Sequence, residues 1–345
     1  MFKSAKKVLS AILIGCMAGG LLAGCGGEQA ASGSGSGSGS QGKIVLKYGE
    51  LNPESHPMAM SAKKFSEIVS QKSNGRIQIE VYTSGQLGDE KTMIQGVQMG
   101  AIDFTRANAN GLGDYGIKKM NLFALPFVFR DRDHIWKVLD SDLGKDILAS
   151  VQSSGSKMVG VGWMEEGARS FFFRNKDVKS VKDMQGMKIR VPQTQILMDT
   201  VSAFGASPTP ISYSELYSSL QTGVVDGAEN PPTGYVANNF NEVAKYYSIS
   251  NYIYSPSVIV MSELNWNKLS KDDQKIITDS MLEVEKYNRS IIDQADKDAI
   301  ESAKQKGAVI SEVTDKTEWQ NAVKPLYDKY GSEFKDLLDK IINTK

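Results

Sequence analysis

The sequence predicts an α/β protein made of two similar lobes that a long helix connects. Three observations lead to this prediction. From residue 44 onward, stretches with strand-like alternation are separated by stretches in which apolar residues recur at helical spacing. A short pattern near residue 100 recurs near residue 223. A helical pattern of more than thirty residues follows Ser270, which is long for a helix within one domain.

The first half of the chain alternates strand and helix. Residues 44–48 and 77–81 alternate apolar and polar side chains, as strands do, and between them Pro57 opens a helix that ends at Asn74 and Gly75. Four further elements are expected in order: a helix at about 89–99, a strand at 101–104, a helix at about 132–152 and a strand at 157–162. Strands separated by helices predict parallel sheets that are covered on both faces.

The second half contains a short strand, a long helix and a helical tail. Residues 186–192 read as a strand that Pro192 stops. Ser270 and Asp273 resemble a capping box at the start of the long helix, which continues to Gly307. This helix either lies along one domain or crosses between the two lobes. Residues 315–345 read as two amphipathic helices.

The repeated pattern supports two lobes of similar construction. Residues 98–103 (QMGAID) match residues 221–226 (QTGVVD): a helix end, a glycine, two apolar residues and an aspartate. Asn108 and Asn230 follow the two aspartates at similar offsets. The match is either a coincidence, because this pattern is common where a helix leads into a strand, or a sign that ligand groups lie at the ends of equivalent strands.

The N-terminus is typical of a bacterial lipoprotein. Lysines precede an apolar run at residues 8–23, too short for a membrane span, so residues 1–24 are predicted to be a signal peptide. The segment ends in Leu-Ala-Gly-Cys25, which resembles a lipobox; Cys16 fits less well, because cleavage there would leave half of the apolar segment. Cys25 is therefore the expected lipidation site, which places the protein outside the cytoplasmic membrane. Residues 25–42, rich in Gly and Ser, are expected to form a flexible tether.

Composition excludes several classes of function. The formal net charge is zero, so no global field favours nucleic acid. The chain has two histidines, and both cysteines lie in the leader, so hydrolytic triads, disulfides and cysteine metal sites have almost no residues to form from. We expect no cofactor, no metal site and no catalytic residue. Residues 111–116 (GLGDYG) have dinucleotide-binding spacing but do not open a helix directly after a strand, so we expect a glycine-rich loop over a cleft.

Two arginines and an asparagine indicate a site for a small organic acid. Arg190 lies in a strand-like stretch, Arg169 precedes it by twenty-one residues, and Asn230 follows the second aspartate of the repeated pattern. A guanidinium keeps its charge at any physiological pH, and its rigid fork of donors fits the two oxygens of a carboxylate.

Several motifs stand together in the order of a known family. They are the lipoprotein leader, His56-Pro57 at the first helix, and residues 86–88 (QLG), 124–127 (ALPF), 186–190 (GMKIR) and 220–227 (LQTGVVDG). The chain resembles a solute-binding protein of a tripartite ATP-independent periplasmic (TRAP) transporter over nearly all of its length after the tether.

The resemblance implies a fold, a ligand and a partner. The fold is a two-lobed clamp like that of periplasmic binding proteins (a Venus flytrap), with a connecting helix. It closes on a carboxylate and delivers it to a membrane permease driven by an ion gradient. We place the first lobe at residues 43–166 and about 256–295, and the second at residues 167–255 and about 296–345. We expect a monomer.

The resemblance also assigns roles to residues. Arg190 matches the arginine that grips the ligand carboxylate, Arg169 a second arginine that assists, and Asn230 an asparagine at the same end of the ligand. Asn108 lies in the first-lobe segment that reaches the ligand in many members. Asp89 or Glu90 stands where some members place an acidic contact to ligand hydroxyls.

Further candidates come from the residues themselves. His56 lies at a helix start, where amide dipoles and an imidazole face an anion favourably. Glu50 and Gln86 add polar groups suited to hydroxyls, Tyr213 and Trp163 are possible stacking walls, and Arg106 shares the strand face of Asn108 by alternation.

Structural roles compete with these assignments. For the arginines the alternative is an ion pair within the protein. Arg169 would pair with Glu165 or Glu166 on the surface, and Arg190 would pair with Asp226 or Glu229. Arg106 would pair with a nearby acid such as Asp103. Asn108 could shape a turn, His56 could cap its helix, and the two aromatic residues could pack in the core.

The first lobe offers several polar candidates: Asn108, Glu50, His56, Gln86 and Glu90. They favour a sugar acid such as glucuronate or galacturonate, because every hydroxyl that loses its water on binding needs a hydrogen-bond partner. A C4-dicarboxylate or keto acid is the alternative, since Arg106 or Arg130 would supply a second cation. A sensor for a membrane signalling partner would share these features, and an enzyme would need an acid/base pair in the cleft.

Overall fold

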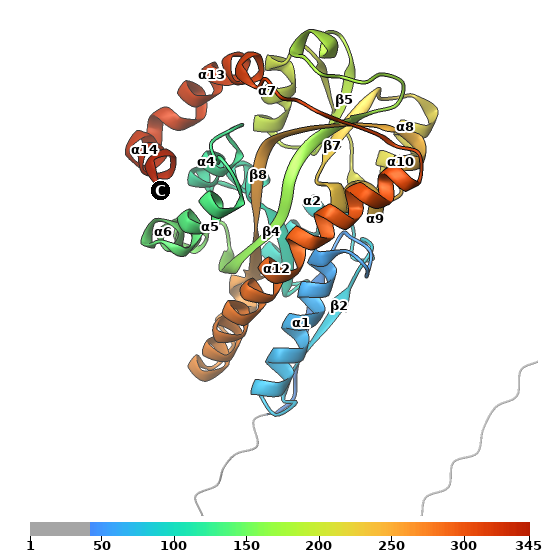
Figure 1. Cartoon of the computed structure of the whole chain (residues 1–345). Coiled ribbons are helices and arrows are strands. Elements are labelled where there is room, and N and C mark those ends of the chain that lie inside the picture. The colour runs from blue at the N-terminus through green and yellow to red at the C-terminus, as the bar shows by residue number, and fades with distance from the viewer. Residues whose placement is uncertain (1–41) are drawn as a thin grey trace, which may run out of the picture. The chain divides into compact units, whose positions relative to one another are not determined.

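The computed structural model describes residues 42–345 (Figure 1). The predicted signal peptide, Cys25 and the tether up to Gln41 lie outside the described residues. Within residues 42–345, none of the helices has the length and apolar character needed to cross a membrane.

The strands form one mixed sheet in the order β2-β1-β3-β8-β4-β7-β5-β6, with β9 beside β8. Their bounds are β1 Ile44–Gly49, β2 Ile77–Tyr82, β3 Phe104–Asn108, β4 Met158–Phe173, β5 Lys188–Val191, β6 Ser207–Pro210, β7 Gly227–Asn230, β8 Tyr246–Ser262 and β9 Val309–Glu312. At one end β1 runs parallel to β2 and β3, and at the other β5 runs parallel to β6 and β7. The prediction of parallel pairing is confirmed at both ends of the sheet.

The middle of the sheet differs from the prediction. β4 and β8 are antiparallel to each other, and they are also antiparallel to β7 and β3 respectively, so they join the two parallel ends (Figure 1). β4 runs far beyond the expected 157–162. The sequence did not show the rest of the strand because β4 is buried on both faces, and a strand buried in this way lacks the alternation of apolar and polar residues. The pairing of β4 with β8 is irregular between Glu165 and Ala168, which face Pro256 and Tyr254. The predicted lobe boundaries fall at this point.

The helices that the sequence predicts are present, with one correction, but those at 109–112, 121–124, 195–203, 232–237, 240–243 and 263–266 were not predicted. The helix bounds are α1 Pro57–Lys72, α2 Glu90–Met99, α3 Ala109–Leu112, α4 Asn121–Ala124, α5 Arg132–Asp140, α6 Asp142–Ser153, α7 Gln195–Ala203, α8 Leu216–Thr222, α9 Pro232–Ala237, α10 Phe240–Val243, α11 Glu263–Trp266, α12 Lys271–Gln305, α13 Thr317–Gly331 and α14 Lys335–Asn343. The predicted helix at 132–152 is two helices, because Ser141 is extended and caps α6. The strand expected at 101–104 begins only at Phe104, after a turn.

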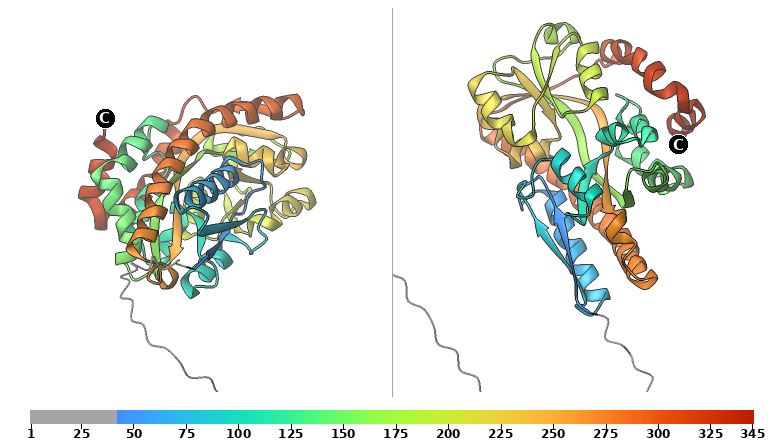
Figure 2. Two further views of the ribbon diagram at one scale, coloured as in Figure 1. Left: turned by 90° about the horizontal axis from the view of Figure 1, so that it is seen from below. Right: turned by 180° about the vertical axis from the view of Figure 1, so that it is seen from behind.

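The long helix α12 crosses between the two ends of the sheet (Figures 1 and 2). Ser270 caps it by accepting the Asp273 N–H at 3.1 Å. Ile277 and Met281 pack into a core with α1, β1 and β2, whereas Ala303 packs with Phe172 and the helices beside β7. The crossing arrangement is therefore the correct one of the two alternatives.

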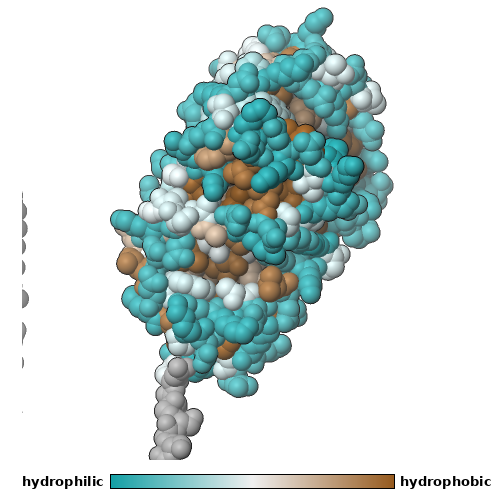
Figure 3. Space-filling view, turned by 90° about the vertical axis from the view of Figure 1, so that its left-hand side faces the viewer, coloured by the Kyte–Doolittle hydropathy of each residue, from teal (hydrophilic) through white to brown (hydrophobic). Residues whose placement is uncertain are grey.

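The C-terminal helices cover one side of the molecule. α13 contacts α7 and α4, and α14 is held to the start of α5 through Arg130, whose guanidinium donates to the Ile342 and Thr344 carbonyls. In Figure 3, which views the side that lies to the left in Figure 1, apolar side chains show in hollows between hydrophilic ones. The segment after residue 296 thus contacts elements of both predicted lobes.

The repeated pattern has equivalent structures in its two copies. Gly100 and Gly223 end α2 and α8 with φ of 78° and 80°, a left-handed conformation that glycine adopts at little cost. Asp103 accepts the N–H of Lys47 on β1 at 2.7 Å, and Asp226 accepts the N–H of Lys188 on β5 at 2.8 Å. The strands that follow, β3 and β7, end in Asn108 and Asn230, so equivalent strands carry the two asparagines.

Candidate functional site

A cavity lies beyond the carboxyl ends of the parallel strands and is lined from both ends of the sheet. Its walls include Asn52, Asp89, Glu90, Lys91, Arg106, Asn108, Gly111, Tyr115, Glu166, Arg169, Arg190, Gln193, Thr194, Ser212, Tyr213 and Asn230. The space measures about 730 Å³, open solvent included, within the range of about 300–1,000 Å³ of small-molecule sites. Strand ends of an open α/β sheet are the expected place for a ligand.

Arg190, the third residue of β5, is a buried cation that no carboxylate among residues 42–345 pairs with. Its side chain is 2 % exposed, and its Nε donates to the Ile211 carbonyl at 2.9 Å. Within residues 42–345, no ion pair joins it to a carboxylate, and its Nη1 has no hydrogen-bond partner. Burial lowers the pKa of Arg190 to about 10. The predicted alternative of an ion pair with Asp226 or Glu229 is wrong: Asp226 binds β5 backbone, and Glu229 is paired with Arg169.

Arg169 is paired on two sides. Its Nη1 lies 3.1 Å from Glu166 Oε2 and its Nη2 lies 2.9 Å from Glu229 Oε1, while its Nε also donates to Glu229. The Tyr252 hydroxyl donates to the same Glu229 at 3.0 Å. Both carboxylates hold the pKa of Arg169 above its usual value against the opposing effect of burial. The alternative of a pair with Glu166 is thus correct in its partner, but the pair is buried and not on the surface, and Arg169 also lines the cavity.

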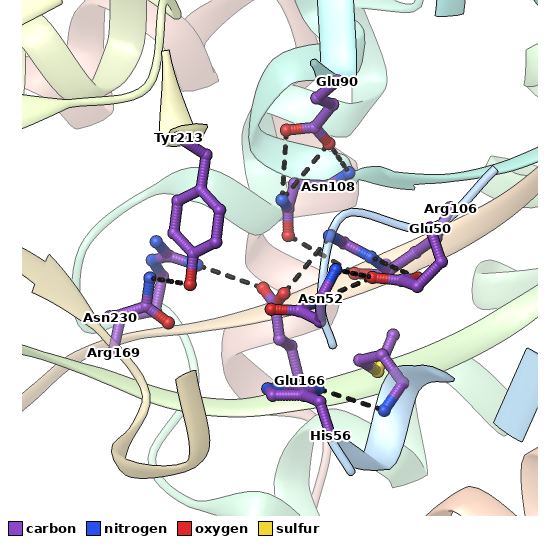
Figure 4. A network of polar contacts seen from close by, with 12 residues as sticks. Glu50, Asn52, His56, Glu90, Arg106, Asn108, Glu166, Arg169, Tyr213 and Asn230 are labelled. Carbon is purple, nitrogen blue, oxygen red and sulfur yellow. Dashed lines mark hydrogen bonds and ion pairs between the residues drawn. The ribbon is translucent and has the colours of Figure 1, made fainter. Parts of the chain in front are cut away.

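Arg106 faces the cavity beside Asn108, as strand alternation predicts. Its Nε lies 3.3 Å from Glu50 Oε2 and its Nη1 lies 3.3 Å from Glu166 Oε1. The alternative that Arg106 pairs with an acid is therefore correct, but the acid is not Asp103, whose carboxylate accepts a backbone N–H of β1. Glu166 therefore lies between Arg106 and Arg169 and joins the two arginines electrostatically (Figure 4).

Asn108 is held by two neighbours. Its backbone N–H donates to Glu90 Oε1 at 2.6 Å, and its Nδ2 lies 3.2 and 3.3 Å from the two oxygens of Glu90. The Ser257 hydroxyl donates to its Oδ1 at 3.3 Å. Asp89 caps α2 by accepting the Thr92 N–H at 2.8 Å. Carboxylate and amide oxygens thus gather on the first-lobe side of the cavity, where they would accept hydrogen bonds from hydroxyls.

Asn230 and Tyr213 face Arg190 from the other side. The Asn230 Nδ2 donates to the Tyr213 hydroxyl at 3.3 Å, and the Asn238 Nδ2 donates to the same oxygen at 3.0 Å. The Tyr213 ring centroid lies 5.6 Å from the Arg190 guanidinium carbon. A Cβ at position 234 would lie 2.0 Å from Asn230 Oδ1, so Gly234 gives the amide its room.

Four predicted residues do not line the cavity. Glu50 lies behind Arg106, and His56 is buried at the start of α1. Gln86 is exposed in the turn after β2. Trp163 is 3 % exposed and packs edge-on against Phe123 in the core, with ring centroids 5.5 Å apart, so the prediction of a stacking wall is wrong.

Other lining residues were not predicted as ligand contacts, among them Glu166, Asn52, Tyr115, Lys91 and Thr194. Tyr115 lies in the glycine-rich segment 111–116, which borders the cavity as expected. The segment is helical and not the predicted loop, because α3 starts directly after β3 and a 3-10 turn at Gly113–Tyr115 follows it. Glu166 could have been found from its position three residues before Arg169. It was missed because this part of β4 was not predicted to be a strand. The others lie on loops that no pattern distinguishes.

His56 predicts a pH dependence of stability. Its Nδ1 accepts the Met58 N–H at 3.2 Å, and burial lowers its pKa to about 4. Because the unfolded chain binds the proton more tightly, this contribution to stability is complete above pH 6.5 and is lost as the pH falls towards 4. We expect His56→Asn, which keeps a capping side chain, to remove about 3 kcal/mol of the pH-dependent loss. Urea unfolding at pH 7 and pH 4.5 measures this; equal pH slopes for the two proteins would contradict it.

Comparisons with known proteins identify the family. A TRAP periplasmic solute binding protein from Pseudomonas putida F1 with bound D-glucuronate is 33 % identical, with a TM-score of 0.84, covering 88 % of this chain and 98 % of that one. One from Xanthobacter autotrophicus Py2 with bound β-D-galacturonate is 31 % identical, with a TM-score of 0.83, covering 87 % and 100 %. The C4-dicarboxylate-binding periplasmic protein DctP of Rhodobacter capsulatus is 28 % identical, covering 83 % and 86 %. The two-lobed periplasmic-binding fold and the TRAP resemblance are confirmed.

Residues 48–333 match the family described as bacterial extracellular solute-binding protein, family 7 (DctP). The match extends over most of the described chain, from β1 to the end of α13. The chain belongs to this family of solute-binding proteins.

Proposed function

We propose that this protein captures a hexuronate such as glucuronate or galacturonate and delivers it to a TRAP-type permease. The observation that carries the proposal is Arg190, a buried guanidinium without an acidic partner among residues 42–345 that faces a cavity of suitable size. Similar proteins that bind glucuronate and galacturonate support the choice of ligand.

The ligand carboxylate would bind Arg190, with Asn230 and Tyr213 completing the set of donors. Charge-assisted hydrogen bonds of this kind contribute about 1.5–3 kcal/mol each. The sugar hydroxyls would lie against Glu90, Asn108 and Asp89, which supply acceptors on the first-lobe side. Binding requires no bond to break, and we propose no catalytic activity.

We divide the two lobes at the irregular pairing of β4 with β8. When the lobes close, residues of one lobe would contact residues of the other across the mouth of the cavity. Thr194, at the start of α7, makes no side-chain cap. The cap comes instead from Asp114 of the glycine-rich segment, which accepts the Gln195 N–H at 3.3 Å. A contact made only when the lobes meet stabilises the closed state relative to the open state.

We expect Asp114→Ala to weaken uronate binding about fivefold through faster dissociation, since a lost helix cap costs about 1 kcal/mol. Stopped-flow fluorescence measures the dissociation rate. Asp142→Ala, which removes an exposed carboxylate at the start of α6, serves as the control. An unchanged dissociation rate for Asp114→Ala would contradict a role in closure.

A C4-dicarboxylate or a keto acid is the second candidate class, since the Rhodobacter capsulatus relative binds C4-dicarboxylates. The pairing of Arg106 with two carboxylates weighs against it, because the second cation is already neutralised. Lipidation at Cys25 would hold the protein, as a monomer, on the outer side of the cytoplasmic membrane beside its permease.

A thermal-shift screen of uronates, succinate, pyruvate and the neutral sugars glucose and galactose tests the proposal. A uronate should raise the melting temperature most, because binding stabilises the folded state by an amount that grows with the logarithm of the ligand concentration over Kd. A shift with a neutral sugar alone would refute it. Co-purification of a sensor kinase instead of permease subunits with the lipidated protein would refute the transport role.

A further inference from the structure

The cavity and its walls hold three buried guanidiniums and three buried carboxylates. Arg106, Arg169 and Arg190 are each at most 3 % exposed, and Glu50, Glu166 and Glu229 at most 6 %. Five of these groups form one chain of ion pairs in the order Glu50, Arg106, Glu166, Arg169, Glu229 (Figure 4 shows its first four members). Arg190 stands outside this chain.

In this arrangement Arg106 and Arg169 are paired with carboxylates and Arg190 is not. In the part of the chain that the structure describes, Arg190 alone among the three has no carboxylate at ion-pair distance. The half-buried Glu90 adds a further negative group to the same cavity. One ligand carboxylate therefore gives the unpaired guanidinium of Arg190 a partner. A second would lie among buried carboxylates, because the one further cation of the lining within residues 42–345, Lys91, is exposed. Like charges brought together in a buried site cost several kcal/mol.

Glu50 can keep Arg106 paired without contacting the ligand. It lies outside the cavity lining, and its Oε2 faces Arg106 at 3.3 Å. Its Oε1 accepts both the backbone N–H and the Nδ2 of Asn52 at 2.9 Å. These two bonds fix the carboxylate behind the guanidinium. The charged and titratable groups close enough to interact electrostatically with Glu50 are Arg106, His56 and Tyr48.

We propose that Glu50, by neutralising Arg106 from behind, restricts the cavity to acids that carry a single carboxylate. Glu50 is thus a specificity-determining residue that acts through Arg106. This inference rests on the proposed function and adds to it: the ligand is a monoanionic, hydroxylated acid, and a dicarboxylate of the same size is rejected.

The test compares D-glucuronate with D-glucarate, the open-chain acid in which C1 of glucuronate is oxidised to a second carboxylate; the change of their ratio between variants isolates the effect of that carboxylate from the effect of ring opening. Calorimetric titration gives the Kd of each ligand. For the unaltered protein we expect the glucarate Kd to exceed the glucuronate Kd about 100-fold. In Glu50→Gln, Arg106 gains a charge free to meet the second carboxylate, and we expect this ratio to fall at least tenfold. Glu50→Asp, which keeps the charge, should retain most of the discrimination.

Glu54→Gln is the matched control, because it removes an exposed carboxylate four residues away that pairs with Lys63; its ratio should equal that of the unaltered protein. Melting curves establish that each variant is folded. If Glu50→Gln does not fold, Glu166→Gln removes the other carboxylate beside Arg106 and should lower the ratio in the same direction.

The outcomes separate this inference from the proposed function. Tight uronate binding with an unchanged ratio in Glu50→Gln and Glu166→Gln overturns the inference alone. Equal affinity of the unaltered protein for glucarate and glucuronate also overturns it. Absence of binding by any uronate refutes the proposed function, and the inference with it.

Discussion

Replacing Arg190 by alanine is expected to lower the affinity for D-glucuronate at least about 100-fold. The guanidinium is the buried cation that no carboxylate of residues 42–345 pairs with, so its donors are available to a ligand. Two charge-assisted hydrogen bonds contribute about 3–6 kcal/mol, and 1.4 kcal/mol corresponds to a factor of ten. Calorimetric titration of both proteins with the uronate measures the loss.

The fold itself should not suffer from this substitution. Burial lowers the pKa of Arg190 to about 10, so Arg190 stays charged at neutral pH and its buried charge destabilises the folded, unliganded protein relative to the unfolded chain. The melting temperature of unliganded Arg190→Ala should therefore not fall. Arg174→Ala, directly after β4 and outside the cavity lining, is the control and should bind normally. A loss below threefold in Arg190→Ala would contradict the role given to this residue.

Replacing Glu229 by alanine is expected to lower the free energy of unfolding by about 3–5 kcal/mol. Breaking a buried ion pair by removing one partner leaves an uncompensated charge, which is far more costly than the pair is stabilising. Arg169 would keep only Glu166, and the Tyr252 hydroxyl would lose its acceptor. Urea unfolding with a linear extrapolation measures the change.

Glu242→Ala is the control for this prediction. Glu242 is exposed, and the hydrogen bond that it accepts from the Tyr217 hydroxyl lies at the surface. Its effect should stay within about 0.5 kcal/mol. If Glu229→Ala changed the free energy of unfolding by less than about 1 kcal/mol, the Arg169–Glu229 pair would not be the structural element described above.

Much of the fold could be predicted because its signals are local. The caps at Gly100 and Gly223 are fixed by neighbours within a few residues, so their repetition was visible in the chain. The helix α12 was visible because one face of it is apolar at regular spacing. The strand with Arg190 was visible because Pro192 ends it.

The remaining features depend on contacts between distant segments. The strand β8 was not predicted, because strands buried on both faces show no alternation. The partners of the arginines could not be read from the sequence: Arg106 meets Glu50 and Glu166 at separations of about sixty residues each, and nothing local favours these over Asp103. Trp163 was placed wrongly for the same reason, since Phe123, its partner, lies forty residues before it.

A crystal structure of the protein with D-glucuronate tests the central claim most directly. We predict that the ligand carboxylate lies within hydrogen-bonding distance of the Arg190 guanidinium, with the sugar hydroxyls directed towards Glu90 and Asn108. A complex in which Arg190 turns to solvent, and the uronate is held by other groups, would contradict it.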